Sequence, residues 1–171
     1  VPPNLVFIMA DQYRGDALGC VGQEPVKTPC LDKLASEGIL WTNAISSYPV
    51  SSPARAMLMT GMYPMSNKVT NNCNSESAPF GCELSADAQC WSDVLRKQGY
   101  ATAYIGKWHL DGSDYFGTGE CPEGWNPDYW YDMKCYLEEL SDEDKVKSRD
   151  PKESYKEDFS ETFTYAHRCS D

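Results

Sequence analysis

A short segment places three chemically useful residues within five positions, directly ahead of an apolar stretch. It reads Ser51-x-Pro53-x-Arg55 and continues into alanine, methionine and leucine over residues 56–59. Proline suits the first turn of a helix, because the N–H that it lacks would have no partner there. The unpaired N–H groups and the dipole at that end favour negative charge, and an arginine fork matches a tetrahedral oxyanion. The spacing therefore suggests that Ser51 faces a bound sulfate or phosphate group.

Taken alone, this spacing fits a simpler interpretation better: a serine that caps a helix and an arginine at the surface. Two further segments change that balance. Thr60-Gly61 follows Arg55, and residues 106–110 read Gly-Lys-Trp-His-Leu. Together with residues 4–19, these segments resemble the signatures of the type I sulfatases, a formylglycine-dependent family of the alkaline-phosphatase-like superfamily. The resemblance covers roughly the first 115 residues well and the remainder loosely.

The resemblance implies that the nucleophile is made from Ser51 after synthesis. In the family, a cysteine or serine at this position is oxidised to formylglycine, whose hydrate carries two hydroxyls on one carbon. One hydroxyl takes up the sulfate as a covalent intermediate, and the other, once deprotonated, collapses to the aldehyde and expels sulfate. A plain serine would be left as an unreactive alkyl sulfate. Serine in place of cysteine implies a radical, oxygen-independent maturing enzyme and a bacterial source.

Roles for the neighbouring residues follow from the same resemblance. Arg55 is expected to hold the formylglycine oxygen and nearby metal ligands, and Lys107 to neutralise charge on the nucleophile and the bound sulfate. His109 is expected to hydrogen-bond the hydrate and to help remove its proton. We expect Trp108 to pack in the core. His167 matches no motif, and we interpret it as structural.

A divalent cation is the expected cofactor, Ca²⁺ in the first place and Mg²⁺ as the alternative. An anionic nucleophile approaching a sulfate ester needs a hard cation to offset the repulsion, and such cations take oxygen ligands. Asp11 is the first ligand candidate, Gln12 the second, although many relatives have Asp there, and the oxidised Ser51 side chain the third. The alternative interpretation of Asp11 and Gln12 is a turn that ends a strand. Asp16 lies nearby but matches no ligand position of the family.

The order of elements predicts an α/β fold, with a mainly parallel sheet sandwiched by helices and incomplete at the C-terminus. Short apolar runs predict strands, and capping residues with helical apolar spacing predict helices. The predicted strands are residues 5–10, 39–47 and 101–106. The predicted helices are residues 29–37, between Thr28 and Gly38, a segment from about Pro53, and a segment from about residue 88 to Gly99.

Composition excludes several classes of partner. The formal net charge of −11 disfavours nucleic acid and anionic membranes, because both need clustered Lys and Arg. No apolar run approaches the roughly 18 residues of a membrane span. Eight cysteines without a C-x-x-C spacing are compatible either with disulfides or with buried free thiols. A periplasmic, cell-surface or secreted location is inferred from the family and the cysteine count, and no signal peptide is visible.

The chain is expected to hold only part of the family's catalytic domain. Residues 1–115 form a core that carries the motifs, and residues 116–171 form a loop-rich, charged extension whose end reads as an interrupted helix. We expect the missing C-terminal half to supply further metal ligands, a histidine and a lysine, so that this chain alone binds metal weakly and turns over little.

Three functions stay open. The first is hydrolysis of a sulfated glycan or aryl sulfate. The second is hydrolysis of phosphonate or phosphate monoesters, which the Asp11–Gln12 pair keeps open. The third is a catalytically incomplete fragment with a role in binding or assembly.

Overall fold

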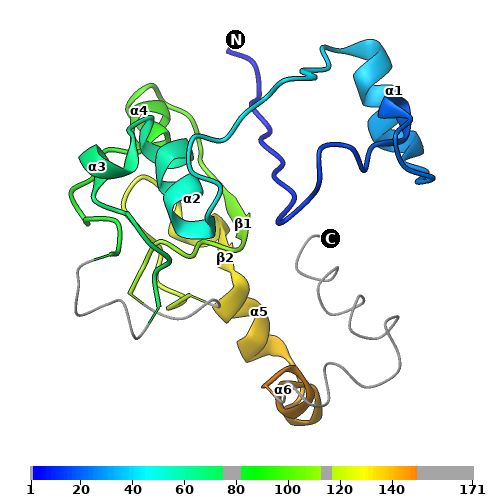
Figure 1. Cartoon of the computed structure of the whole chain (residues 1–171). Coiled ribbons are helices and arrows are strands. Elements are labelled where there is room, and N and C mark those ends of the chain that lie inside the picture. The colour runs from blue at the N-terminus through cyan, green and yellow to red at the C-terminus, as the bar shows by residue number, and fades with distance from the viewer. Residues whose placement is uncertain (1, 75–81, 113–116, 150–171) are drawn as a thin grey trace. The chain divides into compact units, whose positions relative to one another are not determined.

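The computed structural model describes residues 2–74, 82–112 and 117–149. The chain divides into two compact units, Val1–Ile45 and Ser46–Asp171. Figure 1 traces the elements of each unit along the chain.

The first unit contains a 3-10 helix, η1 (Gly19–Val21), and one α-helix, α1 (Pro29–Glu37). The predicted bounds of α1 are confirmed. Thr28 precedes it as expected, but its hydroxyl does not cap the helix backbone. Instead, Thr28 Oγ1 accepts the Gly19 N–H (2.8 Å) and donates to Asp32 Oδ1 (2.7 Å). This hydroxyl lowers the pKa of Asp32, and the contacts tie η1 to α1.

Two predicted strands are wrong. Residues 5–10 and 39–47 form no strand, and their apolar side chains are exposed; Ile8 is 86% and Ile45 89% accessible. A continuous apolar run predicts a strand only because neighbouring strands would pair with its backbone and cover both faces. Within the described residues of the first unit no such neighbour is present, and no residue there is buried.

The second unit contains most of the described helices and a two-stranded parallel sheet. Its elements are α2 (Ser51–Thr60), α3 (Pro64–Asn67), α4 (Trp91–Lys97), β1 (Tyr104–Gly106), η3 (Pro127–Tyr129), β2 (Trp130–Asp132), α5 (Met133–Glu139) and α6 (Asp142–Arg149). Tyr104 pairs with Trp130 and Gly106 with Asp132. The helices predicted from about Pro53 and up to Gly99 are confirmed as α2 and α4, and the strand predicted at 101–106 is β1, shortened by three residues.

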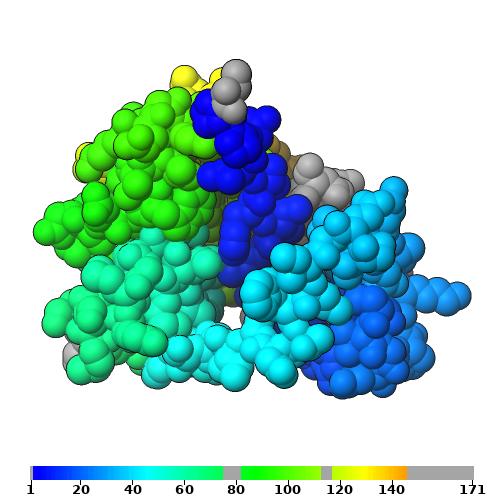
Figure 2. All heavy atoms as spheres, turned by 90° about the horizontal axis from the view of Figure 1, so that it is seen from above, coloured from blue at the N-terminus to red at the C-terminus, as the bar shows by residue number. Residues whose placement is uncertain are grey.

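Aromatic side chains form the centre of the second unit. Tyr104 stacks on Trp130, with ring centroids 4.9 Å apart, and meets Trp108 edge-on at 5.2 Å. Trp125 also packs into this cluster, and α2 adds Ala56 and Met59. Trp108 is only 4% exposed, so its predicted core position is confirmed. In the space-filling view, the teal atoms of α2 and the green atoms of α4 belong to one continuous packed body (Figure 2).

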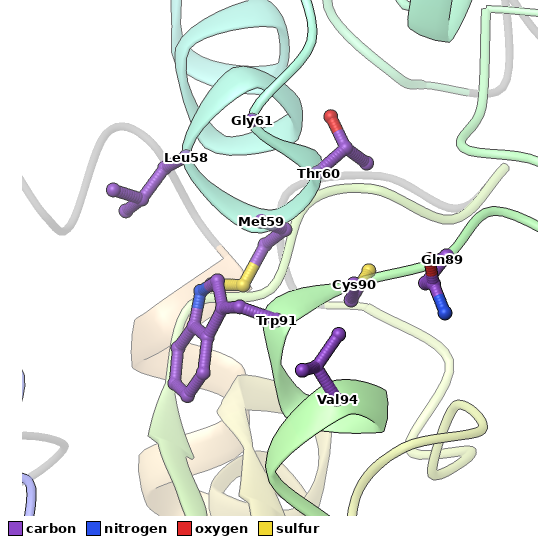
Figure 3. A pocket seen from close by; sticks show the side chains of 8 residues that line it. All are labelled: Leu58, Met59, Thr60, Gly61, Gln89, Cys90, Trp91 and Val94. Atoms are coloured by element: carbon purple, nitrogen blue, oxygen red, sulfur yellow. The ribbon is translucent and has the colours of Figure 1, made fainter.

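A shallow pocket of about 260 Å³ lies between the end of α2 and the start of α4 (Figure 3). Met59, Cys90, Trp91 and Val94 give it a mostly apolar lining. It lies at the opposite end of α2 from Ser51, so it is separate from the candidate active site.

The described part of the charged stretch, residues 138–149, contains the end of α5 and all of α6, and its residues 141–143 are exposed. His167 and the helix expected near the end of the chain lie outside the described residues. None of the helices in the described ranges has the length and apolar character that crossing a bilayer requires.

Candidate active site

The Ser51 segment forms the first turn of α2. Val50 is extended and accepts the Ala54 N–H, so the helix begins at Ser51, two residues earlier than predicted. Pro53 lies in the first turn, where its missing N–H leaves no hydrogen bond unmade. Arg55 follows Ser51 by one turn, on the same face of the helix. The side chain of Ser51 is partly accessible, whereas Arg55 is 6% exposed.

Thr60 and Gly61, the last two residues of the matched signature, end α2. Gly61 adopts a left-handed conformation (φ +70°), and its N–H donates to the Met57 carbonyl at 2.8 Å. Thr60 Oγ1 donates to the Ala56 carbonyl at 2.6 Å. A residue with a side chain is strained at such a φ, and glycine is the usual choice. This part of the signature therefore terminates the helix, at the far end from Ser51.

His109 comes from the turn after β1 and meets the start of α2. Its Nδ1 lies 3.1 Å from Ser51 Oγ, which is hydrogen-bonding distance. His109 is 5% exposed and has a left-handed backbone (φ +57°). Such a conformation is costly for a residue other than glycine and is concentrated at functional sites. The fold thus aims the imidazole at Ser51 through a sharp local turn.

The Lys107 carbonyl joins the two segments. It accepts a hydrogen bond from Arg55 Nη1 at 2.6 Å and another from the Tyr104 hydroxyl. Burial raises the pKa of Tyr104 to about 12, so this phenol stays a donor at neutral pH. Arg55 therefore holds the turn that carries Lys107 and His109, in addition to the role expected from the sequence.

The surroundings of His109 favour its neutral form. Burial lowers its pKa, the Lys107 ammonium lowers it further, and a hydrogen bond to the Cys73 backbone opposes both effects. A neutral imidazole has one nitrogen that accepts a proton. The geometry therefore suits His109 to act as a general base toward position 51.

No sequence motif predicts a second contact network at the start of α2. The Ser52 N–H donates to Asn72 Oδ1 at 3.1 Å, and Ser52 Oγ accepts the Cys73 N–H at 2.9 Å. Ser52 is fully buried. These contacts link residues 20 and 21 positions apart, and no motif covers Asn72 or Cys73. The structure thus adds Ser52, Asn72 and Cys73 to the surroundings of Ser51 and His109.

The predicted metal ligands divide between the two units. Asp11 and Gln12 are exposed residues of the first unit, and Gln12 has a left-handed backbone (φ +51°). Ser51 is in the second unit. A carboxylate, an amide and a hydroxyl are the hard oxygen donors that Ca²⁺ or Mg²⁺ prefers, so the donor chemistry fits. Among the described residues, no group of three His, Cys, Asp or Glu side chains forms a metal cluster. The metal assignment stays a prediction.

Comparison with known proteins connects this geometry to a family. Residues 3–171 match the family model described as Sulfatase. The crystal structure of the putative sulfatase yidJ from Bacteroides fragilis is 65% identical, with a TM-score of 0.66 over 74% of this chain and 30% of that one. The protein BT4656, whose structure is known in complex with its substrate D-glucosamine-2-N,6-O-disulfate, is 33% identical to this chain. Its TM-score is 0.61 over 75% of this chain and 22% of that one.

A phosphonate monoester hydrolase of Agrobacterium radiobacter also has a similar structure. It is 30% identical, with a TM-score of 0.55 over 82% of this chain and 27% of that one. This chain spans a third or less of the length of the curated relatives that it matches. It covers 33% of the uncharacterized sulfatase YidJ of Escherichia coli and 24% of the ulvan-active sulfatase of Formosa agariphila. The similar structures and the parallel β1–β2 pair confirm the predicted α/β fold class. The chain belongs to the sulfatase family and covers part of its catalytic domain.

Proposed function

We propose that the whole protein hydrolyses sulfate esters with a formylglycine made from Ser51. The 3.1 Å contact between Ser51 Oγ and His109 Nδ1 carries this proposal, in a chain that matches the sulfatase family. The position of Ser51 at the start of α2, beside Arg55, suits it to a reaction of anions. The dipole at the start of the helix and a nearby guanidinium favour the anions that the reaction makes and releases.

In the proposed reaction, one hydroxyl of the hydrated aldehyde at position 51 loses its proton and attacks sulfur. The S–O bond to the alcohol breaks, and the departing alkoxide takes up a proton. The second hydroxyl then loses its proton to His109, the C=O bond re-forms, and sulfate leaves. His109 is suited to this step because burial and Lys107 lower its pKa and keep the ring neutral. Water then adds to the aldehyde and restores the hydrate, so the nucleophile is regenerated without a second attack on sulfur.

Arg55 and Lys107 balance the negative charge of this site. Arg55 also fixes the Lys107 carbonyl, so a change at either residue is expected to displace the turn that carries His109. A bound Ca²⁺ or Mg²⁺, held by Asp11, Gln12 and the oxidised Ser51 side chain, would offset repulsion between nucleophile and sulfate ester.

We propose a sulfated carbohydrate as the substrate, with an aryl sulfate as a convenient reporter. The support is the similar solved structure in complex with its disulfated glucosamine substrate. Conversion of Ser51 calls for a radical maturing enzyme as a partner, and a location outside the cytoplasm is proposed with it.

Hydrolysis of phosphonate monoesters is the second candidate, favoured by the similarity to the Agrobacterium enzyme.

The test is to produce the full-length protein with a radical maturing enzyme and to compare its turnover of nitrophenyl sulfate with its turnover of a nitrophenyl phosphonate ester. The tryptic peptide 34–55 should be lighter by two hydrogen atoms when Ser51 is converted. Ser51→Ala should abolish turnover, and Ser36→Ala, at an exposed serine of α1, should not. Faster turnover of the phosphonate ester by converted protein would reject the sulfatase proposal.

A further inference from the structure

Two buried cysteines meet next to the candidate active site. Cys73 is 1% exposed and Cys82 8%. The Cys73 thiol donates to the Cys82 main-chain carbonyl, with Sγ and O 3.1 Å apart. A carbonyl oxygen is two bonds from its own Cα, so this contact makes the two cysteines close neighbours, and a disulfide between them needs a Cα separation of roughly 4.4–6.8 Å.

Cys73 also contacts the catalytic segment through its backbone. Its N–H donates to Ser52 Oγ at 2.9 Å, and Ser52 is the residue that follows Ser51 in the chain. Its backbone also forms a hydrogen bond with the His109 side chain. Cys73 therefore touches the neighbour of the nucleophile and the proposed base at the same time, and its position affects both.

We propose that Cys73 and Cys82 form a disulfide as the protein folds, and that this bond holds the Cys73 backbone against Ser52 and His109. The two thiols lose two protons and two electrons, and an S–S bond forms. The electrons reduce a disulfide oxidant, such as oxidised glutathione, to two thiols. The inference goes beyond the proposed function, because the bond can be detected whether or not the protein hydrolyses sulfate.

The surroundings indicate when the bond forms. Burial raises the pKa of the Cys73 thiol to about 11, so little thiolate is present in the folded state at neutral pH. Thiolate is the species that reacts in disulfide exchange. The bond is therefore expected to form during folding, before burial is complete, and to resist reduction afterwards.

Cys90 is a matched control. It is 5% exposed, and burial raises its pKa to about 11 as well. Its side chain caps the start of α4, and it lines the pocket between α2 and α4 (Figure 3). Serine is itself a good helix cap, so Cys90→Ser removes a buried thiol while keeping the capping function.

The first test is a peptide map of the full-length protein, refolded in a glutathione redox buffer and then alkylated. Trypsin releases residues 69–96, which contain Cys73, Cys82 and Cys90. A glutamate-specific protease then cuts after Glu76 and Glu83. We expect peptides 69–76 and 77–83 to stay joined until reductant is added, and Cys90 to be alkylated. Alkylation of Cys73, or its linkage to another cysteine, would overturn the proposal.

The second test asks whether the bond positions the site. Cys82→Ser leaves the Cys73 side chain in place, and we expect it to lower the melting temperature by about 2–8 °C. We also expect kcat to fall about tenfold at equal conversion of Ser51, because small misplacements of catalytic groups are costly. Cys90→Ser should keep the linked peptides and change kcat less than twofold. If the wild-type protein carries the disulfide, a Cys82→Ser variant with wild-type stability and kcat would reject the positioning role.

The outcomes separate this proposal from the sulfatase proposal. The linked peptides and the melting temperature do not depend on sulfate hydrolysis. Linked peptides in a converted protein without sulfatase activity would reject the function and keep the disulfide. Active protein in which Cys73 and Cys82 are both free thiols would reject the disulfide and keep the function.

Discussion

Ser51 Oγ and His109 Nδ1 lie 3.1 Å apart, although the two residues are 58 positions apart in the chain. The contact requires the start of α2 and the turn after β1 to meet. The Lys107 carbonyl helps to bring them together by accepting hydrogen bonds from Arg55 and Tyr104.

Replacing His109 with asparagine should separate the chemical role of the imidazole from the shape of its turn. Asparagine tolerates the left-handed backbone that His109 adopts, so the fold should be retained. Loss of a general base should lower kcat by about 10²- to 10⁴-fold. The measurement is kcat on nitrophenyl sulfate at equal conversion of Ser51. An asparagine variant within threefold of wild type would contradict the assigned role.

Tyr104→Phe should remove one of the two donors to the Lys107 carbonyl and keep the aromatic packing. We expect the free energy of unfolding to fall by about 1 kcal/mol, the usual net worth of one hydrogen bond. Because Arg55 still holds the same carbonyl, kcat should fall only a few-fold. Urea unfolding and steady-state kinetics measure the two effects. An unchanged midpoint would show that the phenol hydroxyl adds no stability.

Gly124→Ala should destabilise the second unit. Gly124 has φ +91°, and a Cβ there would lie 2.5 Å from Asp93 Oδ1 and 2.8 Å from Ser92 Oγ. Asp93 also accepts the Cys90 N–H at the start of α4, so a shift of its side chain disturbs that cap. The expected loss is about 1–3 kcal/mol, measured by denaturant unfolding. Gly15→Ala, where a Cβ meets nothing within 4 Å, is the control and should be near neutral.

Stability of the reduced protein should fall as the pH rises above about 9. Burial raises the thiol pKa of Cys73 and Cys90 from 9.0 to about 11. Above pH 9, thiols of the unfolded chain ionise while these two remain protonated in the fold. The unfolded state then binds fewer protons, and the free energy of unfolding decreases toward about pH 11. The urea midpoint in reductant at pH 8 and pH 10 measures this decrease, and Cys90→Ser should reduce it. A midpoint that rises with pH would contradict the expected sign.

Chelation and a ligand variant test the metal assignment. If Asp11 holds a divalent cation, activity should be lost with a chelator and restored by Ca²⁺ or Mg²⁺. Asp11→Asn should raise the cation concentration needed for half-maximal activity, because it removes the carboxylate from the proposed ligand set. Asp16→Asn is a matched control, since Asp16 matches no ligand position. Equal cation dependence of both variants and the wild type would reject Asp11 as a ligand.

Elements with local signals could be predicted from the sequence, and elements that depend on distant partners could not. Thr28, Pro29 and Gly38 bound α1 through nearby contacts, and its limits are confirmed. Residues 5–10 carry a buried-strand pattern, but no strand pairs with them in the described structure. A strand depends on backbone partners elsewhere in the chain, and an apolar run alone does not supply them.

The same distinction holds at the candidate site. Ser51, Arg55, Lys107 and His109 stand in recognisable segments, and the structure brings these four together. The contacts of Ser52 with Asn72 and Cys73 had no signal, because they depend on how a loop returns to the start of α2. Spacing along the chain does not encode such a return.

The left-handed turn at Gly61 has a practical consequence for protein engineering. The Ser51–Gly61 signature combines the candidate catalytic residues at one end with a stop for α2 at the other. Randomising positions 60 and 61 would therefore give a library that contains many misfolded variants and few variants with altered activity. Diversity aimed at new substrates belongs in the loops around the other end of that helix.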